Sequence, residues 1–354
     1  MKSIVMTQLG VPEEKKLGIL DLIDIPMPAV GPEDVLVRIA YASICGSDMH
    51  VLRSNLSADL LETISSNLPW RFGHEISGYV EKMGEVAAAT TGLKIGDRVT
   101  ANYTHFCNSC YFCRTGQENF CEHPQAHFDG MSEYVSWHMS QIYKIPDEVS
   151  LLDASQTEPC SIALNACQTV GVHFGSRVLI SGAGAIGLMA VQLAKHAGAS
   201  LITVSDVVPE KCELAIKCGA SGTVDPREKD WREKAMELTH GRGYDAVIEC
   251  SGASSAAQSI VDLMTVNGHA VLFAMYNPDF EMKIKPFETL YQQSKHIHGM
   301  YTSADSFPKT IAMLTSMNFD PIIQGVYEKE DYQRAFEDQA TGKFAKLVFK
   351  FAGE

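Results

Sequence analysis

The sequence predicts an α/β protein of two domains, a β-rich domain followed by one with a doubly wound parallel sheet. Residues 1 to about 155 contain short β-type runs broken by glycine and proline, such as EDVLVRIAYASI and EISGYVEKMG. From about residue 176, apolar strands such as RVLIS alternate with helical segments such as IGLMAVQLAKHAGA, the pattern of a parallel sheet with helices on both faces. Near the C-terminus, FAKLVFKF predicts a strand with alternating faces.

Length and composition agree with this organisation. A chain of 354 residues is too long for one ordinary hydrophobic core. Its 45% apolar and 20% charged residues are typical of a soluble globular protein. The sequence has 29 basic and 43 acidic residues, a net charge of −14, and no basic run. We therefore expect neither nucleic acid nor an anionic membrane surface as a partner.

The sequence predicts a cytoplasmic location. Its first stretch, MKSIVMTQLGVPEEKK, becomes charged too early for a secretory signal. No apolar run approaches the ~18 residues that are needed to span a bilayer. In a reducing compartment, clustered cysteines are expected to be metal ligands rather than disulfides.

The stretch RVLISGAGAIGLMAVQLAK predicts a dinucleotide-binding loop. It places Gly182, Gly184 and Gly187 in G-x-G-x-x-G spacing between a strand and a helix. Gly182 permits the tight turn, Gly184 lets the backbone approach a pyrophosphate, and Gly187 allows close helix–strand packing. The helix N-terminus adds N–H groups and a positive dipole end, which hold an anion despite the negative net charge.

The next predicted strand ends at Asp206, which favours NAD(H) as the cofactor. A carboxylate at this place can accept both ribose hydroxyls of NAD, and it repels the 2′-phosphate of NADP. The alternative is a glycine-rich turn that binds no ligand. The combination of strand, loop, helix and acid favours the nucleotide site.

Four cysteines lie within fifteen residues at C-x2-C-x2-C-x7-C spacing: Cys107, Cys110, Cys113 and Cys121. Four thiolates fill the tetrahedral shell of a structural zinc, so we expect this site to do no chemistry. The segment NSCYFCRTGQENF has few apolar residues, and a bound metal would supply the stability that it lacks. Free thiols or a redox pair are the alternatives.

A second, open metal site is predicted from residues in separate stretches. Cys45 lies in ASICGSDMH, His74 and Glu75 in GHEISGY, and Glu158 in TEPCS. A thiolate, an imidazole and a carboxylate make three bonds to zinc and leave one position for water or substrate. Each residue alone also has an ordinary explanation, as a buried cysteine, a surface histidine or a capping glutamate.

With these residues, the chain resembles the zinc-dependent medium-chain alcohol dehydrogenases, of the branch that contains sorbitol, threonine and butanediol dehydrogenases. The resemblance runs nearly end to end and rests on CGSDMH, GHEISG, GDRV, the four-cysteine loop, EPCSIALNA, GAGAIG and ECSG. It implies a GroES-like β domain over residues 1–155, to which residues 300–354 return, and a Rossmann NAD-binding domain over residues 156–299. It also implies two zinc ions per chain and a homo-oligomer, either a dimer or a tetramer.

By this resemblance, Cys45 and His74 correspond to ligands of the catalytic zinc. The carboxylate ligand is Glu75 or Glu158, and the sequence leaves this choice open. Cys160 is a less favoured substitute for Glu158.

Ser47 and His50 match the proton relay of the family. Zinc acidifies a bound water or alcohol, and the released proton then needs a hydroxyl beside the metal and a group that titrates near neutrality. The resemblance also implies that Lys211 reaches the adenosine ribose, although a solvated helix face is the alternative. It assigns further cofactor contacts to Gly182, Gly184, Ala185, Ile186, Gly187, Asp206 and Phe273.

Together these expectations define an NAD(H)-dependent oxidoreductase that interconverts a secondary alcohol and its ketone by hydride transfer. The family favours a polyol or another small secondary alcohol. Three departures from the family instead favour a bulkier apolar alcohol such as a hydroxysteroid. Val51 and Leu52 stand where polyol-oxidising members usually carry an aromatic residue, Thr302 stands in place of an arginine, and residues 51–72 form a long loop with several apolar side chains.

A zinc-free quinone reductase or a non-catalytic member of the fold is the remaining alternative. It predicts disruption of Cys45, His74 and Glu158, and all three are present.

Overall fold

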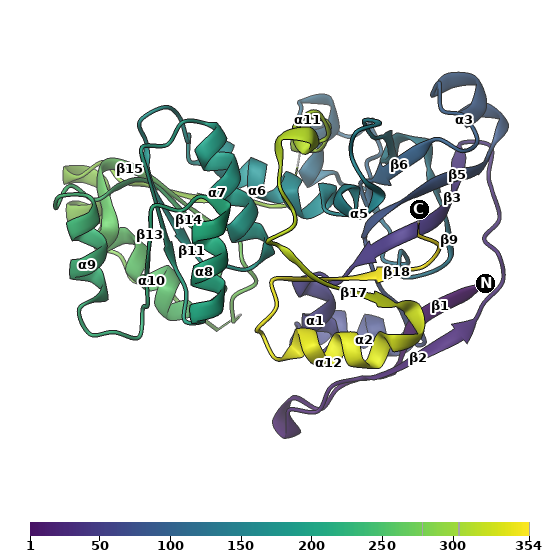
Figure 1. Cartoon of the computed structure of the whole chain (residues 1–354), viewed down its shortest axis with the longest axis horizontal. Helices are drawn as coiled ribbons and strands as arrows, with labels where there is room; N and C mark the ends of the chain where they lie inside the picture. The colour runs from purple at the N-terminus through teal and green to yellow at the C-terminus, as the bar shows by residue number, and fades with distance from the viewer. Residues whose placement is uncertain (278, 304, 354) are drawn as a thin grey trace. The chain divides into compact units, whose positions relative to one another are not determined.

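The structure is a computed structural model that describes residues 1–277, 279–303 and 305–353 (Figure 1). The chain divides into two compact units. The first comprises Met1–Glu158, Phe307–Phe319 and Ile323–Glu354, and the second comprises Pro159–Ser306 and Asp320–Ile322. The unit boundaries therefore lie after residues 158 and 306, whereas the predicted domain boundaries lie after residues 155 and 299.

The first unit is built around a sheet of seven strands among the described residues. Six strands run in the order β10-β6-β5-β3-β18-β17, and β9 also pairs with β3. These strands are β3 (Asp34–Ser43), β5 (Glu75–Met83), β6 (Arg98–Ala101), β9 (Tyr134–His138), β10 (Ile142–Lys144), β17 (Ile323–Glu328) and β18 (Lys346–Lys350). Because β18 pairs antiparallel with β3, the last strand of the chain completes the sheet of the first unit.

Shorter elements complete the first unit. Strand β1 (Lys2–Gln8) lies between β2 (Ile19–Asp24) and β4 (Trp70–Arg71), and β7 (Thr104–His105) pairs with β8 (Gln125–Ala126). The helices are η1 (Pro12–Glu14), α1 (Gly46–Leu52), α2 (Ala58–Ser66), α3 (Glu85–Thr90), α4 (Tyr111–Arg114), η2 (Glu118–Phe120), η3 (Met139–Gln141), α5 (Leu151–Ala154), η5 (Leu314–Ser316), η6 (Lys329–Asp331) and α12 (Tyr332–Ala340). Helices α6 (Thr157–Thr169) and α11 (Ser306–Met313) begin next to the unit boundaries.

Strand β18 differs from the prediction of alternating faces. Lys346, Leu347, Val348 and Phe349 are all buried. The reason is that β18 lies between β3 and β17 inside the sheet, and both of its faces are covered. A lysine in this strand is therefore placed in the interior of the unit.

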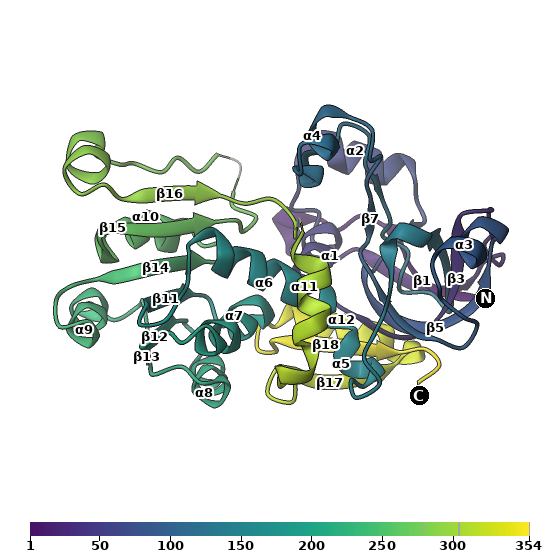
Figure 2. The same ribbon diagram turned by 90° about the horizontal axis from the view of Figure 1, so that it is seen from above.

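The second unit contains a parallel sheet of six strands among the described residues. Their order is β13-β12-β11-β14-β15-β16, and Figure 2 shows them stacked in this order. The strands are β11 (Arg177–Ser181), β12 (Leu201–Ser205), β13 (Gly222–Val224), β14 (Tyr244–Glu249), β15 (Met264–Leu272) and β16 (His296–Gly299). The strand order reverses between β11 and β14, which is where doubly wound sheets bind nucleotides.

Helices cover both faces of this sheet. They are α7 (Ala185–His196), α8 (Pro209–Cys218), α9 (Trp231–Leu238) and α10 (Ser254–Leu263), and the π-helix η4 (Phe287–Gln292) precedes β16. Figure 1 shows the sheet between the α7–α8 pair and the α9–α10 pair. In the part of the chain that the structure describes, no helix is both long and apolar enough to cross a membrane.

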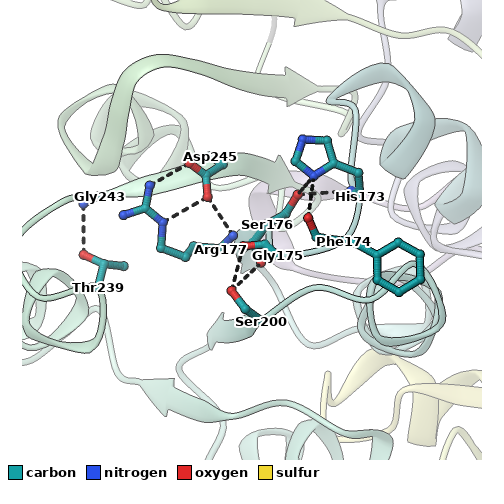
Figure 3. A network of polar contacts seen from close by, with 9 residues as sticks. All are labelled: His173, Phe174, Gly175, Ser176, Arg177, Ser200, Thr239, Gly243 and Asp245. Carbon is teal, nitrogen blue, oxygen red and sulfur yellow. Dashed lines mark hydrogen bonds and ion pairs between the residues drawn. The ribbon is translucent and has the colours of Figure 1, made fainter.

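Polar contacts join the amino ends of β11 and β14 (Figure 3). Nε and Nη2 of Arg177 donate to the carboxylate of Asp245 at 2.9 and 2.6 Å, and the backbone N–H of Arg177 donates to the same carboxylate at 2.8 Å. The hydroxyl oxygen of Ser176 accepts a hydrogen bond from the backbone N–H of His173, and that of Thr239 accepts one from the backbone N–H of Gly243. These bonds fix β11 at the end opposite the predicted dinucleotide loop, and so support the strand that carries this loop.

Candidate metal and cofactor sites

Cys45, His74 and Glu75 lie together in the first unit. One ligand atom of each lies within 4.8 Å of the other two. The pairing of β3 with β5 explains this proximity, because Ser43 at the end of β3 pairs with Glu75 at the start of β5. The chain therefore delivers Cys45 and His74, both in loops next to these strand ends, to the same place.

Helix α1 holds Cys45 through a capping box. The backbone N–H of Cys45 donates to Oδ2 of Asp48 at 2.9 Å, and the Cys45 side chain accepts from the backbone N–H of Asp48. Asp48 is 4% exposed, and burial raises the pKa of its carboxyl group although His74 opposes the shift. The capping contacts fix the position of the thiol at the N-terminus of the helix.

His74 is buried in a negatively charged environment. Its Nδ1 atom has no hydrogen-bond partner among the described residues and lies 4.0 Å from Oδ1 of Asp48. Burial lowers the pKa of His74, but Cys45, Asp48 and Glu158 outweigh it and raise this pKa well above its usual value. The surroundings thus stabilise a positive charge at this point. An unpartnered ring nitrogen beside a thiol and carboxylates fits a zinc ion.

Two aromatic rings enclose the imidazole of His74. The ring of Tyr103 lies 5.0 Å from it, and the ring of Phe128 packs edge-on at 5.7 Å. Tyr103 and Phe128 also contact each other at 5.4 Å. These two aromatic residues were not predicted as part of the site, because they lie far from His74 along the chain.

Glu75 forms a buried ion pair with Lys346 of β18. Nζ of Lys346 donates to Oε1 and Oε2 of Glu75 at 2.8 and 2.7 Å, and to the carbonyl of Ile44 at 3.1 Å. The two residues are 0% and 3% exposed. Burial alone would lower the pKa of Lys346, but Glu75 and Cys45 raise it, so the lysine stays charged. Lys346 was not predicted as a site residue, because its only signal in the sequence is a lysine within an apolar run.

Glu158 at the start of α6 faces the same group of residues. Burial raises the pKa of Glu158 to about 7, with a further rise from Glu75, while His74 and Lys346 oppose it. Its carboxylate does not belong to the set of described ligand atoms that lie within 4.8 Å of one another. Cys160, two residues further, is fully buried, and burial raises the pKa of its thiol to about 12. Such a thiol is inert at neutral pH, which fits a packing role.

The predicted relay residues both lie on α1. Ser47 and His50 are three positions apart on the helix and so lie on the same side of it. Both side chains are half-buried. Burial and the charge of Arg53 lower the pKa of His50, although a hydrogen bond with the backbone of Asn55 opposes the shift. His50 is therefore neutral at pH 7 and able to accept a proton.

The four cysteines of the second predicted metal site form a compact cluster. Their sulfur atoms lie within 4.8 Å of one another: Cys107, Cys110, Cys113 and Cys121. Backbone N–H groups of Cys107 and Cys110 donate to neighbouring sulfur atoms at 3.4 Å. Hydrogen bonds, of which those with Ser109 have the largest effect, lower the pKa of Cys107 to about 5. Four converging sulfurs with N–H donors around them fit a closed zinc site.

The dinucleotide loop has the geometry that its glycines predict. Gly182 has φ +105°, a conformation that favours glycine. A Cβ atom on Gly187 would lie 1.9 Å from the carbonyl oxygen of Gly182, so only glycine fits there. A Cβ atom on Gly184, the N-cap of α7, would meet no atom within 4 Å. The open space above Gly184, at the start of a helix, fits a pyrophosphate.

Asp206 follows β12 beside this loop. Its Oδ2 accepts from the backbone N–H of Ala183 at 2.6 Å, and its Oδ1 accepts from that of Val208 at 2.8 Å. Lys211 on α8 is half-buried, and burial lowers its pKa while the nearby Asp206 opposes the shift. Ala185 and Ile186 begin α7, and Phe273 directly follows β15. The structure thus places these residues at the carboxyl ends of the parallel strands.

The segment 51–72, predicted as a loop, contains the end of α1, helix α2 and strand β4. Its apolar residues belong largely to the core of the first unit. Leu52, Ile64 and Phe72 are buried, and Leu56, Leu68 and Trp70 pack against the same core cluster. Packing therefore accounts for most of this apolar surface.

Comparisons with known proteins agree with this geometry. The model of the alcohol dehydrogenase GroES-like domain matches residues 31–147, and the zinc-binding dehydrogenase model matches residues 185–316. The chain is 31% identical to the sorbitol dehydrogenase of Gallus gallus, with 95% of this chain and 94% of that protein covered. It is 32% identical to the L-threonine 3-dehydrogenase of Pyrococcus horikoshii, with 93% and 94% covered.

Solved structures give the same result. A protein from Clostridium scindens ATCC 35704, described as a zinc-binding dehydrogenase, is 42% identical and superposes with a TM-score of 0.95 over 99% of both chains. A second such protein, from Sinorhizobium meliloti 1021 and bound to NADP, is 26% identical with a TM-score of 0.86 and covers 99% of this chain and 98% of its own.

The chain belongs to the zinc-dependent medium-chain alcohol dehydrogenases. It is therefore an oxidoreductase that uses zinc and a nicotinamide cofactor, and the predicted combination of a GroES-like domain with a Rossmann sheet is confirmed.

Proposed function

We propose that this enzyme is an NAD(H)-dependent dehydrogenase that interconverts a small polar secondary alcohol, of the polyol or 3-hydroxy amino acid class, and its ketone. The convergence of Cys45, His74 and Glu75 on one point carries this proposal. The names of the relatives, sorbitol dehydrogenase and L-threonine 3-dehydrogenase, support the substrate class.

Cys45, His74 and Glu75 would hold the catalytic zinc. Bound there, zinc would polarise and acidify the substrate hydroxyl. The paired charge of Lys346 compensates Glu75, so the site tolerates two further acids, Asp48 and Glu158, nearby. Glu158 lies near these residues and is the alternative carboxylate that would hold the metal.

Ser47 and His50 would carry the released proton away from the alcohol. The serine hydroxyl accepts the proton and passes it on, and the neutral imidazole of His50 is the acceptor at the next turn of the helix.

The loop Gly182–Gly187 would bind the cofactor pyrophosphate, and Asp206 would bind the adenosine ribose. Two backbone N–H groups hold Asp206 in a fixed orientation, so a 2′-phosphate would meet a carboxylate that cannot turn away. This arrangement supports NAD over NADP, although the relative from Sinorhizobium meliloti 1021 binds NADP. Lys211 and Phe273 would complete the site at the ribose and the nicotinamide.

Cys107, Cys110, Cys113 and Cys121 would hold a second, structural zinc. Four thiolates leave no position for substrate, and the segment between the cysteines contains only the short helices α4 and η2. The metal would therefore stabilise this segment and take no part in the reaction.

Kinetics with a substrate panel test the proposed activity. Sorbitol, 2,3-butanediol, L-threonine and a steroid alcohol would each be offered with NAD and with NADP, and kcat/KM compared. We expect the highest value for one of the three small alcohols with NAD. A steroid alcohol that exceeds all three would overturn the substrate class, and a preference for NADP would overturn the role of Asp206.

We further propose that the enzyme is a cytoplasmic homo-oligomer. Val266, Phe287 and Tyr291 of the second unit are 64%, 64% and 77% exposed, which is a high exposure for large apolar side chains. Strand β16 at the end of the described sheet adds an unpaired backbone edge. Light scattering coupled to size exclusion would give the mass, and a monomer at micromolar concentration would contradict the proposal.

A further inference from the structure

Three histidines meet on one face of the sheet in the second unit, where β15 and β16 lie side by side (Figure 2). His269 lies on β15, and His296 and His298 lie two residues apart on β16. The parallel register pairs His269 with His296. Because side chains alternate along a strand, all three point to the same side of the sheet.

The three rings are in contact with one another. Nδ1 of His269 lies 3.0 Å from Nε2 of His298. The ring of His269 stacks on that of His296, with ring centroids 4.3 Å apart and an interplanar angle of 12°. The rings of His269 and His298 are also nearly parallel, with an interplanar angle of 9° and centroids 5.2 Å apart. His296 is exposed and the other two are half-buried, so the cluster is open to solvent.

We propose that His269, His296 and His298 form a metal site for a divalent late transition-metal ion, such as Zn²⁺ or Ni²⁺. Imidazole nitrogen is a preferred ligand of these ions. Ligand nitrogens of a tetrahedral zinc lie about 3.3 Å apart, close to the separation between His269 and His298. The ion would replace the proton that these two nitrogens share.

A hydrogen bond with Asn267 favours the tautomer of His296 that can act as the third ligand. Its Oδ1 lies 3.3 Å from Nε2 of His296, and a hydrogen bond donated by this nitrogen leaves Nδ1 unprotonated. Burial, with the neighbouring His296 and His298, lowers the pKa of His269.

Binding here requires a rotation of the His296 ring, because the centroids of His296 and His298 are 6.2 Å apart. Exposed side chains rotate on the picosecond to nanosecond timescale, so this movement is no barrier. The two cysteine-containing clusters already bring their ligand atoms within 4.8 Å. The histidine site is therefore weaker than those two, and it uses none of the residues assigned to zinc, proton transfer or cofactor.

Equilibrium dialysis of the zinc-loaded enzyme against Ni²⁺ tests the proposal, with bound nickel and zinc measured by mass spectrometry. The cysteine-containing sites keep their zinc, so nickel reports the third site. The wild type should bind about one Ni²⁺ per chain, with nitrogen ligands in X-ray absorption. The double variant His296→Asn, His298→Asn should lose at least about tenfold in Ni²⁺ affinity.

The control is His240→Asn, which removes an exposed histidine elsewhere in the same unit. His240 has φ +53°, a conformation that asparagine tolerates, so the variant should fold and bind Ni²⁺ as the wild type does. Equal Ni²⁺ binding by the wild type and the double variant would overturn the proposal, as would a wild type that binds none. The double variant should keep its alcohol dehydrogenase kinetics, so this result is independent of the proposed function.

Discussion

At the scale of single residues, Lys346 and Glu75 form a pair of charges in the interior of the first unit. A buried ion pair contributes little net stability, but removal of one partner leaves the other charge uncompensated. We expect Lys346→Met to lower the free energy of unfolding by about 3–5 kcal/mol and to reduce the zinc content, because Glu75 loses the group that holds its carboxylate.

Urea denaturation together with metal analysis measures both effects. Lys346→Arg keeps the positive charge and serves as the control, with a smaller loss of stability from its larger side chain. If Lys346→Met were as stable as the wild type and held the same zinc, the pair would have no role at the site.

His50 gives a prediction for the pH dependence of the enzyme. Its pKa lies below the usual value of 6.5 because of burial and the charge of Arg53. A relay histidine must be neutral to accept a proton, so kcat/KM for alcohol oxidation should rise with pH and reach half of its plateau below pH 6.5. His50→Gln should remove this acid limb and lower kcat on the order of 10²-fold.

The affinity of His50→Gln for NADH should match the wild type, since the helix α1 does not carry the nucleotide loop. An unchanged pH profile in the variant would show that the proton leaves by another route.

Local patterns were sufficient to predict Cys45, His74 and the cysteine quartet as metal-ligand candidates, because each lies in a short motif with donor chemistry. Lys346 could not be predicted as a partner of Glu75. The two residues are 271 positions apart, and only the pairing of β18 with β3 brings them together. Tyr103 and Phe128 could not be predicted as neighbours of His74 either, because they are distant in the sequence and contact it only in the folded chain.

At the scale of elements, the turn from β11 to α7 allows two glycine substitutions to be compared. A Cβ atom on Gly184 would meet nothing in the protein within 4 Å, whereas one on Gly187 would clash with the Gly182 carbonyl at 1.9 Å. We expect Gly184→Ala to change the free energy of unfolding by less than about 0.5 kcal/mol and to weaken NADH binding by about tenfold or more. Gly187→Ala should cost about 1–3 kcal/mol of stability.

Thermal denaturation and fluorescence titration with NADH separate the two effects. Wild-type affinity for NADH in Gly184→Ala would mean that the pyrophosphate does not approach the backbone at this position.

The second unit shows how far periodicity determines the elements. Strand and helix alternate from β11 onward, the pattern that predicts a parallel sheet, so its sheet was predictable. Strand β18 was predicted with alternating faces, which is wrong. Its central position in the sheet depends on β17 and β3, and neither neighbour can be inferred from the strand itself.

At the scale of the whole molecule, the chain combines one unit that carries the candidate metal ligands with one that carries the predicted dinucleotide loop. Family membership follows from both halves, because each matches its own family model. The segment 51–72, which was predicted as a long loop, illustrates the limit of sequence reasoning about substrates. Its apolar residues suggested a bulky substrate, yet Leu52, Ile64 and Phe72 are buried core residues.

The measurement that tests the central claim most directly is the zinc content and NAD-linked alcohol oxidation of His74→Ala beside Cys110→Ser. The wild type should retain about two zinc ions per chain after dialysis against a mild chelator, and each variant about one. His74→Ala should lose activity by at least about 10³-fold, while folded Cys110→Ser keeps most of its activity per molecule. If His74→Ala kept both its zinc and its activity, the assignment of the catalytic centre to Cys45, His74 and Glu75 would be wrong.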